Sequence, residues 1–404
     1  MQPEITFSNA QSRDHDFTLA VLPVKSRTLQ QLAILSQVGT SSDARLGALA
    51  EALSVSPLWA EMPRATLVVR AGPDPLLGVM GYFDAAGRAR LEALRWQLEH
   101  ILPRLRYVGY AQAQEDCERL AARLVERFGR DELRGFRFVA IPRGGLIVLG
   151  MLAYILGLER SQLEPSQDTG APLIIVDDCA LSGVRFREFL SHLESSRVVF
   201  AHLYSSPELR EAIEVRESGC VTCLSAHDLR DHAQENLGEQ HLAWKRRWLE
   251  RMNGEGYWVG QGEQVCFAWN EPDFGFWNPV TEREENGWRF LPPDLCLKNR
   301  PPSGAHPIPV QFQPQGKGPL RPSSSVLFGD FEGQVAVGNL KTGESFILEG
   351  VGTDMWRAVV EYGNLEEAAD ALLKIYEVDA ATLRADLREF VEDLLSQSLL
   401  ENRA

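Results

Sequence analysis

LIIVDDCALSGVRF, residues 173–186, is the stretch that decides the fold of the central part of this 404-residue chain. Four apolar residues, Leu173 to Val176, lead into Asp177 and Asp178, and Ser182–Gly183 then precede a segment with helical spacing. Such a run is typical of a buried strand that ends at the ligand-binding edge of an open α/β sheet. The carboxylates could bind sugar hydroxyls or a magnesium ion, and the loop amides could hold a phosphate. The alternative is an acidic pair that caps a loop before an ordinary Ser-Gly turn.

A second motif with a similar layout lies upstream. In FVAIPRGG, residues 138–145, a strand-like run leads into Pro142 and Arg143 and then into Gly144 and Gly145. Two residues without a Cβ atom allow the backbone to approach an anion closely, and Arg143 adds a cation. The alternative is a simple turn between a strand and a helix, so this motif by itself predicts little.

The segments around both motifs alternate between strand-like and helical spacing. Strand-like runs cover residues 138–141, 173–176, 197–204 and 219–224, and helical patterns cover 112–128 and the segments from 146 and from 184. This alternation predicts an α/β fold with a doubly wound parallel sheet.

In this order, each at the end of a predicted parallel strand, the two motifs resemble the type I phosphoribosyltransferase family over about residues 105–230. The resemblance implies a magnesium-dependent transferase that displaces pyrophosphate from C1 of phosphoribosyl pyrophosphate. It implies that the catalytic pair, Asp177 and Asp178, binds the ribose hydroxyls and orders Mg²⁺. By the same resemblance the pyrophosphate meets Pro142, Arg143, Gly144 and Gly145, and the 5′-phosphate loop consists of Ala180, Leu181, Ser182, Gly183, Val184 and Arg185.

Two departures from that family leave a second function open. Leu181 stands where purine-salvage members often carry an acidic residue or Thr, and only about 27 residues separate Gly145 from Leu173. This connection leaves little room for the family's mobile catalytic loop, in which Arg160 and Asp168 are the remaining candidates. The alternative to a transferase is a non-catalytic sensor of a phosphorylated ribose that serves as an adaptor.

An aromatic-rich segment, residues 239–299, follows the predicted sheet. In the phosphoribosyltransferase family a variable hood covers the acceptor, and aromatic rings stack on planar bases. The resemblance therefore suggests an acceptor site made by Trp269, with Glu271 and Asp273 to accept a hydrogen bond from a base. A small satellite core is the alternative.

A Pro-rich stretch, residues 301–322, precedes the C-terminal segment. It holds seven prolines and three glycines, a density that disfavours helices and central strands, so we expect a semi-stiff linker. After it, three strand-like runs lie between residues 326 and 349, and three helical patterns begin near residues 355, 364 and 379. This order predicts a winged-helix-like α+β domain of three strands and three helices over residues 323–404.

From Val326 to Glu401 the chain resembles the PqqD family of RiPP recognition elements. The resemblance is carried by a Gly-Thr-x-x-Trp entry into the first helix, a Tyr-x-Val-Asp link and a closing amphipathic helix that ends in Leu-Leu-Glu. These domains bind the leader of a precursor peptide as a strand added to their third strand, against the last helix. The resemblance places peptide binding on Ser345, Phe346, Ile347 and Leu348, and on Leu383, Leu387 and Val391. The alternative is that the helical stripe is simply core.

Charge disfavours a nucleic-acid partner. The chain carries a net charge of −15, and residues 323–404 hold 16 Asp and Glu against 6 Lys and Arg. Phosphate contacts need clustered Lys and Arg, so the tail does not read as a DNA-binding winged helix. No secretory signal and no apolar run of membrane-spanning length is apparent, so we expect a cytoplasmic protein without a membrane partner.

The sequence as a whole predicts four parts. Residues 1–100, with helical patterns at 29–38 and 44–53 and a strand-like run at 67–69, form an accessory region of unknown role. A phosphoribosyltransferase-like domain with an aromatic hood (101–300), the linker (301–322) and the peptide-binding domain (323–404) follow. We expect the tail to bring a precursor peptide, or a peptide-modifying enzyme, close to a transferase that uses phosphoribosyl pyrophosphate and Mg²⁺.

Overall fold

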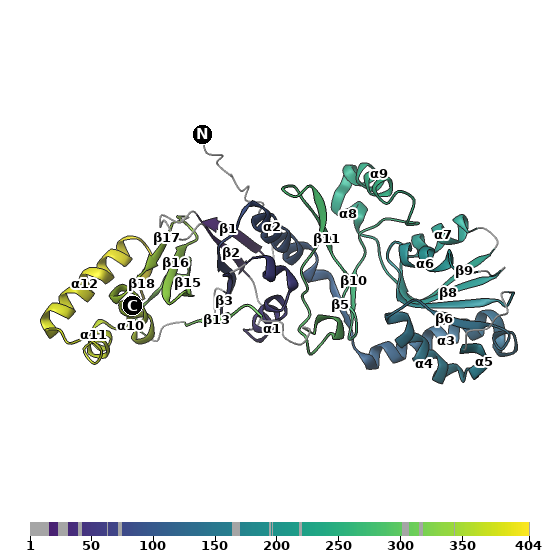
Figure 1. Ribbon diagram of the computed structural model, residues 1–404, viewed down its shortest axis with the longest axis horizontal. Helices are drawn as coiled ribbons and strands as arrows, with labels where there is room; N and C mark the ends of the chain where they lie inside the picture. Colours follow the sequence, from purple (N-terminus) through teal and green to yellow (C-terminus); the bar gives the residue numbers. More distant parts are fainter. Residues whose placement is uncertain are drawn as a thin grey trace. The chain divides into compact units, whose positions relative to one another are not determined.

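The computed structural model describes residues 16–22, 31–38, 43–62, 64–71, 75–163, 170–193, 195, 197–217, 220–300, 307–314, 318–342 and 344–403, the residues up to 44 by their backbone alone. The chain divides into two compact units (Figure 1). The first, here the α/β unit, comprises Arg104–Pro272 and Cys296–Lys298. The second, here the composite unit, comprises Met1–Pro103, Asp273–Leu295 and Asn299–Ala404.

A four-stranded parallel sheet in the order β6-β7-β8-β9 forms the centre of the α/β unit. Successive residues of a strand face opposite sides of a sheet, so Ile174 and Val176 pack on one side and Ile175 on the other. Helices α3 and α4 cover the first side, and α6 and α7 cover the second. The expected parallel α/β sheet is confirmed. The bounds are β6 Arg137–Ala140, β7 Leu173–Cys179, β8 Val198–Ser205, β9 Val221–Asp228, α3 Tyr110–Leu133, α4 Gly144–Leu156, α6 Val184–Leu190 and α7 Pro207–Arg216.

Smaller elements complete the α/β unit. Strand β5 (Leu105–Val108) pairs in parallel with β10 (Gln264–Phe267), and the short helices are α5 (Arg160–Leu163), α8 (Ala233–Leu237) and α9 (His241–Arg251). Asp168, one of the catalytic-loop candidates, lies outside the described residues.

A five-stranded sheet in the order β1-β2-β4-β3-β13 forms one layer of the composite unit. Its strands are β1 (Asp16–Leu22), β2 (Gln31–Val38), β3 (Thr66–Arg70), β4 (Leu76–Gly81) and β13 (Val310–Gln313), and its helices are α1 (Asp43–Ser54) and α2 (Ala85–His100). The expected helix at 44–53 and strand at 67–69 are confirmed. The helical pattern at 29–38 is wrong, because β2 takes that place and pairs with both β1 and β4.

The Pro-rich stretch is not a linker over its whole length. Strand β13 pairs in parallel with β3, and β14 (Leu320–Pro322) pairs with β18 (Leu400–Asn402). The prolines flank these strands or end them, which leaves the backbone N–H groups of Val310–Gln313 available to the sheet. Residues 301–306 and 315–317 lie outside the described residues.

The C-terminal segment has the expected three strands followed by three helices. Strands β15 (Val326–Phe331), β16 (Gln334–Asn339) and β17 (Ser345–Leu348) form an antiparallel sheet, followed by α10 (Val351–Tyr362), α11 (Leu365–Leu372) and α12 (Ala380–Ser396). Gly363, at a φ of +63°, ends α10, and the side chain of Asn364 caps α11 by accepting from the N–H of Glu366 at 2.9 Å. One face of the sheet packs on the helices around Trp356.

The other face of this small sheet is covered by the N-terminal sheet. Leu327 and Ala336 pack with Val68 and Met80, and a Cβ on Gly78 would lie only 2.5 Å from a methyl carbon of Leu327. Strands β3 and β4 of the N-terminal region therefore bury the second face of the C-terminal sheet.

The aromatic segment is divided between the two units. Residues 273–295 belong to the composite unit, where β11 (Gly275–Asn278) and β12 (Arg283–Asn286) form a hairpin. Trp288 is 1% exposed, donates its indole N–H to the C=O of Arg90 at 3.1 Å and lies 4.5 Å from the ring of Trp59. For this half, the satellite core is the correct interpretation, and the expected boundary at residue 300 is wrong.

Within the described part of the chain, the helices are all too short or too polar to traverse a lipid bilayer.

Candidate functional site

Strand β17 is an edge of the C-terminal sheet. Among the described strands it pairs only with β16. The N–H of Asn339 donates to the C=O of Glu344 at 2.8 Å, and along an antiparallel ladder the hydrogen-bonding groups of successive residues point to opposite sides. Ile347, an odd number of residues from Glu344, therefore directs its N–H and C=O away from β16.

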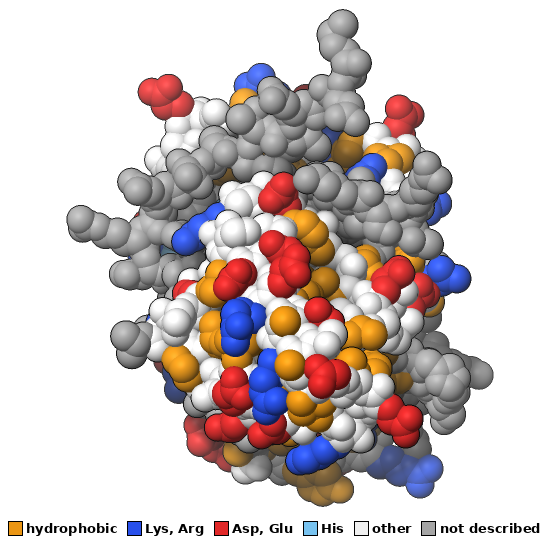
Figure 2. All heavy atoms as spheres, turned by 90° about the vertical axis from the view of Figure 1, so that its left-hand side faces the viewer, with side chains coloured by type: hydrophobic (Ala, Val, Ile, Leu, Met, Phe, Trp, Pro, Cys, Tyr) orange, Lys and Arg blue, Asp and Glu red, His pale blue; other side chains and the backbone are white. Residues whose placement is uncertain are grey.

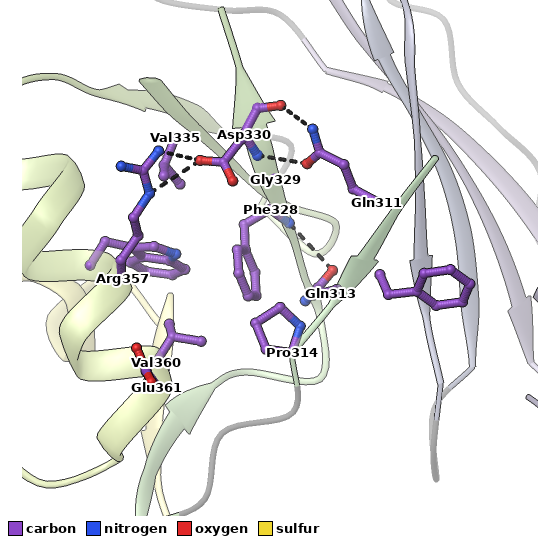
Figure 3. A pocket seen from close by; sticks show the side chains of 12 residues that line it. Gln311, Gln313, Pro314, Phe328, Gly329, Asp330, Val335, Arg357, Val360 and Glu361 are labelled. Atoms are coloured by element: carbon purple, nitrogen blue, oxygen red, sulfur yellow. Dashed lines mark hydrogen bonds and ion pairs between the residues drawn. The ribbon is translucent and has the colours of Figure 1, made fainter. Parts of the chain in front are cut away.

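The opposite edge, β15, is covered by two side chains of β13 (Figure 3). The amide of Gln311 donates to the C=O of Asp330 at 2.6 Å and accepts from its N–H at 2.8 Å. The amide of Gln313 donates to the C=O of Val326 at 3.2 Å and accepts from the N–H of Phe328 at 3.5 Å. These amides stand where the backbone of a neighbouring strand would, so this edge of β15 is occupied.

The predicted strand residues of the peptide-binding surface lie at the β17 edge. Phe346 and Leu348 are partly buried and pack against the helical core, whereas Ile347 packs against the core shared with the N-terminal sheet. Ser345 is 2% exposed. A strand added beside β17 would thus meet apolar side chains on both faces of the sheet.

The predicted helical residues of that surface are part of the domain core. Leu383, Leu387 and Val391 are 4%, 1% and 2% exposed and pack in the same cluster as Trp356. The stripe of α12 is core, as the alternative interpretation held. Phe390, beside it on α12, is only partly buried and remains at the margin of this core.

The face of the composite unit drawn in Figure 2 is mixed in character. Acidic, basic and hydrophobic side chains are interspersed there, and the described residues form no continuous basic area. This distribution agrees with the excess of acidic residues in 323–404.

In the α/β unit the two predicted motifs meet at the carboxyl ends of β6 and β7. A Cβ on Gly144 would lie 1.6 Å from Oδ2 of Asp178, and a Cβ on Gly145 would lie 2.4 Å from the C=O of Val176. Glycine is required at both positions because any side chain would overlap these oxygens. The structure thus brings the arginine turn and the paired aspartates together.

Donors of the chain itself surround the two carboxylates. Asp177 and Asp178 are 2% and 1% exposed. Arg185 donates to Oδ1 of Asp177 and to the C=O of Pro142, both at 3.1 Å. The indole N–H of Trp269 donates to Oδ2 of Asp178 at 2.9 Å. Burial, and next the charge of Asp178, raise the pKa of Asp177 well above its usual value, while Arg185 acts in the opposite direction.

These carboxylates do not fit a resident magnesium ion in this arrangement. Both oxygens of Asp178 already accept, from the N–H of Cys179 at 2.8 Å and from Trp269, and Oδ1 of Asp177 accepts from the N–H of Asp178 at 2.9 Å. Magnesium demands nearly octahedral oxygen ligation, usually with several waters, and two enclosed carboxylates offer little room for it. Among the described residues there is also no group of three or more acidic, His or Cys side chains that could hold a metal.

The predicted 5′-phosphate residues form the turn between β7 and α6. Gly183 has a φ of +76°, and a Cβ there would lie 2.6 Å from the ring of Tyr257. The C=O of Ser182 accepts from the N–H of Tyr257 at 2.9 Å, which fixes the turn. Ala180 is 5% exposed, Leu181 is 38% exposed and Val184 is half-buried.

The three predicted acceptor residues do not form one site within either unit. Trp269 and Glu271 belong to the α/β unit, and Asp273 belongs to the composite unit, where its side chain is exposed. Trp269 is 5% exposed and stacks on Phe267 at 4.9 Å between centroids. Glu271 is 1% exposed, so neither presents a free face for a base.

A buried polar network near the same sheet edge was missed by the sequence analysis. The carboxylate of Asp116, on α3, accepts from the hydroxyl of Tyr204, from Nε2 of His227 at 2.6 Å and from the amide of Gln112 at 3.0 Å. Asp116 is fully buried. The burial of Tyr204, and next its hydrogen bond to Asp116, raise the pKa of the Tyr204 hydroxyl. The signal available in the sequence is the polar pair His227–Asp228 after the predicted strand.

Comparison with known proteins identifies one part of the chain. Residues 334–400 match the family described as coenzyme PQQ synthesis protein D (PqqD). Among solved structures, TbiB1 in complex with the TbiA(beta) leader peptide is 35% identical over 21% of this chain and 98% of its own, with a TM-score of 0.20. A hypothetical protein from Neisseria gonorrhoeae with bound ppGpp is 15% identical over 31% of this chain and 82% of its own, with a TM-score of 0.24. No curated protein matches the chain.

The C-terminal domain is therefore a PqqD-like RiPP recognition element, as the sequence predicts. None of these matches names the phosphoribosyltransferase family, which stays a prediction.

Proposed function

We propose that the PqqD-like domain of this chain binds the leader segment of a precursor peptide as a fourth strand on β17. The observation that carries this proposal is the difference between the two edges of the sheet. Gln311 and Gln313 occupy the backbone groups of β15, whereas Ile347 on β17 turns its N–H and C=O outward. Added-strand recognition takes its affinity from such main-chain groups.

Side-chain selectivity comes from the two faces beside that edge. Alternate residues of a bound strand would contact Phe346 and Leu348 on the helical side and Ile347 on the side of the N-terminal sheet. Because both contacts are apolar, the preferred peptide carries hydrophobic residues on both faces of a short strand. TbiB1, which is 35% identical over 21% of this chain, is solved in complex with a leader peptide, and this likeness in sequence favours the same choice of partner.

The test is a selection from a displayed library of random peptides against the full chain. Ile347→Pro removes the outward N–H without breaking a bond to β16, so we expect selected peptides to bind this variant at least about tenfold more weakly, the free energy of one to two hydrogen bonds. Ile347→Val keeps the N–H and serves as the matched control, with affinity unchanged within about twofold. Peptides that bind the Pro variant as well as the native chain would contradict the proposal.

A second function is supported by the α/β unit, which we propose binds a phosphorylated ribose such as phosphoribosyl pyrophosphate. The supporting observation is the convergence of Gly144 with Asp178 and of Arg185 with Asp177 at one sheet edge. Ligands of open α/β sheets bind at this edge. Ribose hydroxyls would compete with Arg185 and Trp269 for the same carboxylate oxygens, and Arg143 is exposed beside them.

Calorimetric titration of the full chain with phosphoribosyl pyrophosphate, with and without Mg²⁺, tests this second function. We expect binding that Asp178→Asn weakens at least about tenfold, because one hydroxyl acceptor is replaced by an amide. Asp386→Asn, an exposed change on α12, is the control. Release of pyrophosphate in the presence of nucleobases would establish a transferase, binding without release would establish the sensor and adaptor, and no binding would remove both.

A further inference from the structure

Arg185 is the accessible member of the charged cluster at the carboxyl end of β7. Its side chain is 45% exposed, whereas those of Asp177 and Asp178 are 2% and 1% exposed. Nη2 of Arg185 lies 3.1 Å from Oδ1 of Asp177, and Nη1 lies 3.8 Å from Oδ1 of Asp178. Of these three charged groups, a ligand that enters from solvent therefore meets the guanidinium first.

The same guanidinium joins the two motifs of the α/β unit. Nη2 of Arg185 donates to Oδ1 of Asp177 and to the C=O of Pro142, both at 3.1 Å. Gly183, at a φ of +76°, is the residue before α6, so Arg185 lies in the first turn of that helix, close to the end of β7. One cation thus contacts both aspartates, which is the role that the family resemblance implies for Mg²⁺.

A divalent ion would have to displace this guanidinium. Arg185 offsets one of the two negative charges and repels a second cation. Oδ1 of Asp177 and both oxygens of Asp178 already accept hydrogen bonds from the chain. Magnesium gives up its water reluctantly, so a site with this reduced charge and these occupied oxygens binds it weakly.

Arg185 also keeps donors for a ligand. Its two hydrogen bonds both come from Nη2, and a guanidinium has further N–H donors on Nε and Nη1. Within the described part of the chain, Nε and Nη1 make no hydrogen bond. Phosphate oxygens accept strong charge-assisted hydrogen bonds from arginine. The exposed part of this side chain can therefore hold an oxyanion while Nη2 stays on Asp177.

We propose that Arg185 takes the place of a divalent cation in this unit: it neutralises the aspartates, excludes a metal ion and donates to the phosphate of the bound ligand. This inference rests on the proposed binding of a phosphorylated ribose and adds that the binding needs no metal. Because a divalent ion stabilises the charge of a departing pyrophosphate, its replacement by Arg185 favours the sensor and adaptor over the transferase.

Manganese(II) alone is the probe for metal exclusion, because it takes the same oxygen ligands as Mg²⁺ and its electron spin resonance signal measures the free ion. We expect the native full chain to bind Mn²⁺ weakly. Arg185→Gln leaves the two aspartates without a cation, so it should bind Mn²⁺ at least about tenfold more tightly. Adding Asp178→Asn to this variant should remove the gain, which assigns the ion to the aspartates.

Arg185→Lys and Arg187→Gln are the matched controls, and circular dichroism checks that each variant is folded. Lysine keeps the positive charge at position 185, so Mn²⁺ binding should stay as weak as in the native chain. Arg187 lies two residues further along α6, so Arg187→Gln changes the net charge equally but leaves Arg185 in place. Arg185→Gln that binds Mn²⁺ no more tightly than the native chain or Arg187→Gln overturns the proposal.

Calorimetry with ribose 5-phosphate tests the ligand part of the proposal. We expect the same affinity of the native chain within about twofold in Mg²⁺ or in EDTA, and a loss of at least about tenfold in Arg185→Gln under both conditions. Binding that requires Mg²⁺ overturns the proposal. Absence of any ribose 5-phosphate binding contradicts the proposed function and the ligand part with it, whereas the Mn²⁺ series separately decides whether Arg185 excludes a metal.

Discussion

The side-chain amide of Gln311 pairs with both backbone groups of Asp330, donating to its C=O at 2.6 Å and accepting from its N–H at 2.8 Å. Gln313 repeats the pattern two residues away, and Arg70 donates to the C=O of Val326 at 2.7 Å and to that of Ser324 at 2.6 Å. An exposed edge strand is a template for unwanted pairing, and these contacts from β3 and β13 cover the β15 edge. Among the described strands of this sheet, β17 keeps an unpaired edge, and on this edge we propose that a peptide binds.

Replacing both glutamines by leucine should reopen β15. The buried N–H of Phe328 loses its acceptor, at a cost of about 1–3 kcal/mol, so Gln311→Leu/Gln313→Leu is expected to lower the free energy of unfolding and to promote dimers through the β15 edge. Urea unfolding and sedimentation velocity measure the two effects. Gln334→Leu, which removes an exposed bond to Glu349, is the control. A monomeric double variant of native stability would show that the amides are dispensable.

Gly144 and Gly150 lie on the same helix and should respond oppositely to alanine. Gly144→Ala places a Cβ 1.6 Å from Oδ2 of Asp178, so the turn must shift, and we expect a loss of about 1–3 kcal/mol. Gly150 has nothing within 4 Å of its Cβ position, so Gly150→Ala should stabilise α4 by about 0.5–1 kcal/mol. Unfolding followed by fluorescence measures both. Equal effects would mean that the close contact at Asp178 is absent in solution.

Asp177 should make stability depend on pH with a defined sign. Its pKa is raised by burial and by Asp178, so the folded chain holds this proton more tightly than the unfolded chain. The contribution of Asp177 therefore becomes less favourable as pH rises from its ordinary value near 4 through the raised value. The asparagine of Asp177→Asn cannot ionise. The free energy of unfolding of this variant, minus that of the native chain, should therefore become more positive as pH rises from 4 to 7.5. A difference that stays constant over this range would contradict the raised pKa.

Removing the Asp116 carboxylate should destabilise the α/β unit more than removing any one of the groups that donate to it. Asp116→Ala leaves the buried hydroxyl of Tyr204 and the ring nitrogen of His227 without an acceptor, so we expect a loss of about 3 kcal/mol. Tyr204→Phe removes one donor and keeps His227 bound, with a loss of about 1.5 kcal/mol. Thermal unfolding ranks the two variants. If both lose the same stability, the carboxylate interacts mainly with Tyr204.

Local sequence patterns predict the strands and helices correctly where residues close in the chain determine the structure. Alternation of strands and helices predicts β6 to β9, and the order of runs after residue 326 predicts the three strands and three helices of the C-terminal domain. The segment at 29–38 was misassigned as a helix because its apolar residues fit either period, and pairing with β1 and β4 decides the outcome. The sequence does not predict β13, because the density of prolines around it is typical of a linker. A strand this short fits between prolines because it lies at the edge of the sheet.

Strands β6 to β9, the elements of the C-terminal domain and the motifs at the strand ends follow from the sequence alone, since glycine, proline and apolar spacing act over a few positions. Which of those residues are accessible depends on tertiary packing. Packing placed Leu383, Leu387 and Val391 in a core, turned Arg185 and Trp269 onto the two aspartates and set Gln311 and Gln313 against β15. These outcomes depend on contacts between residues far apart in the chain, which local spacing does not encode.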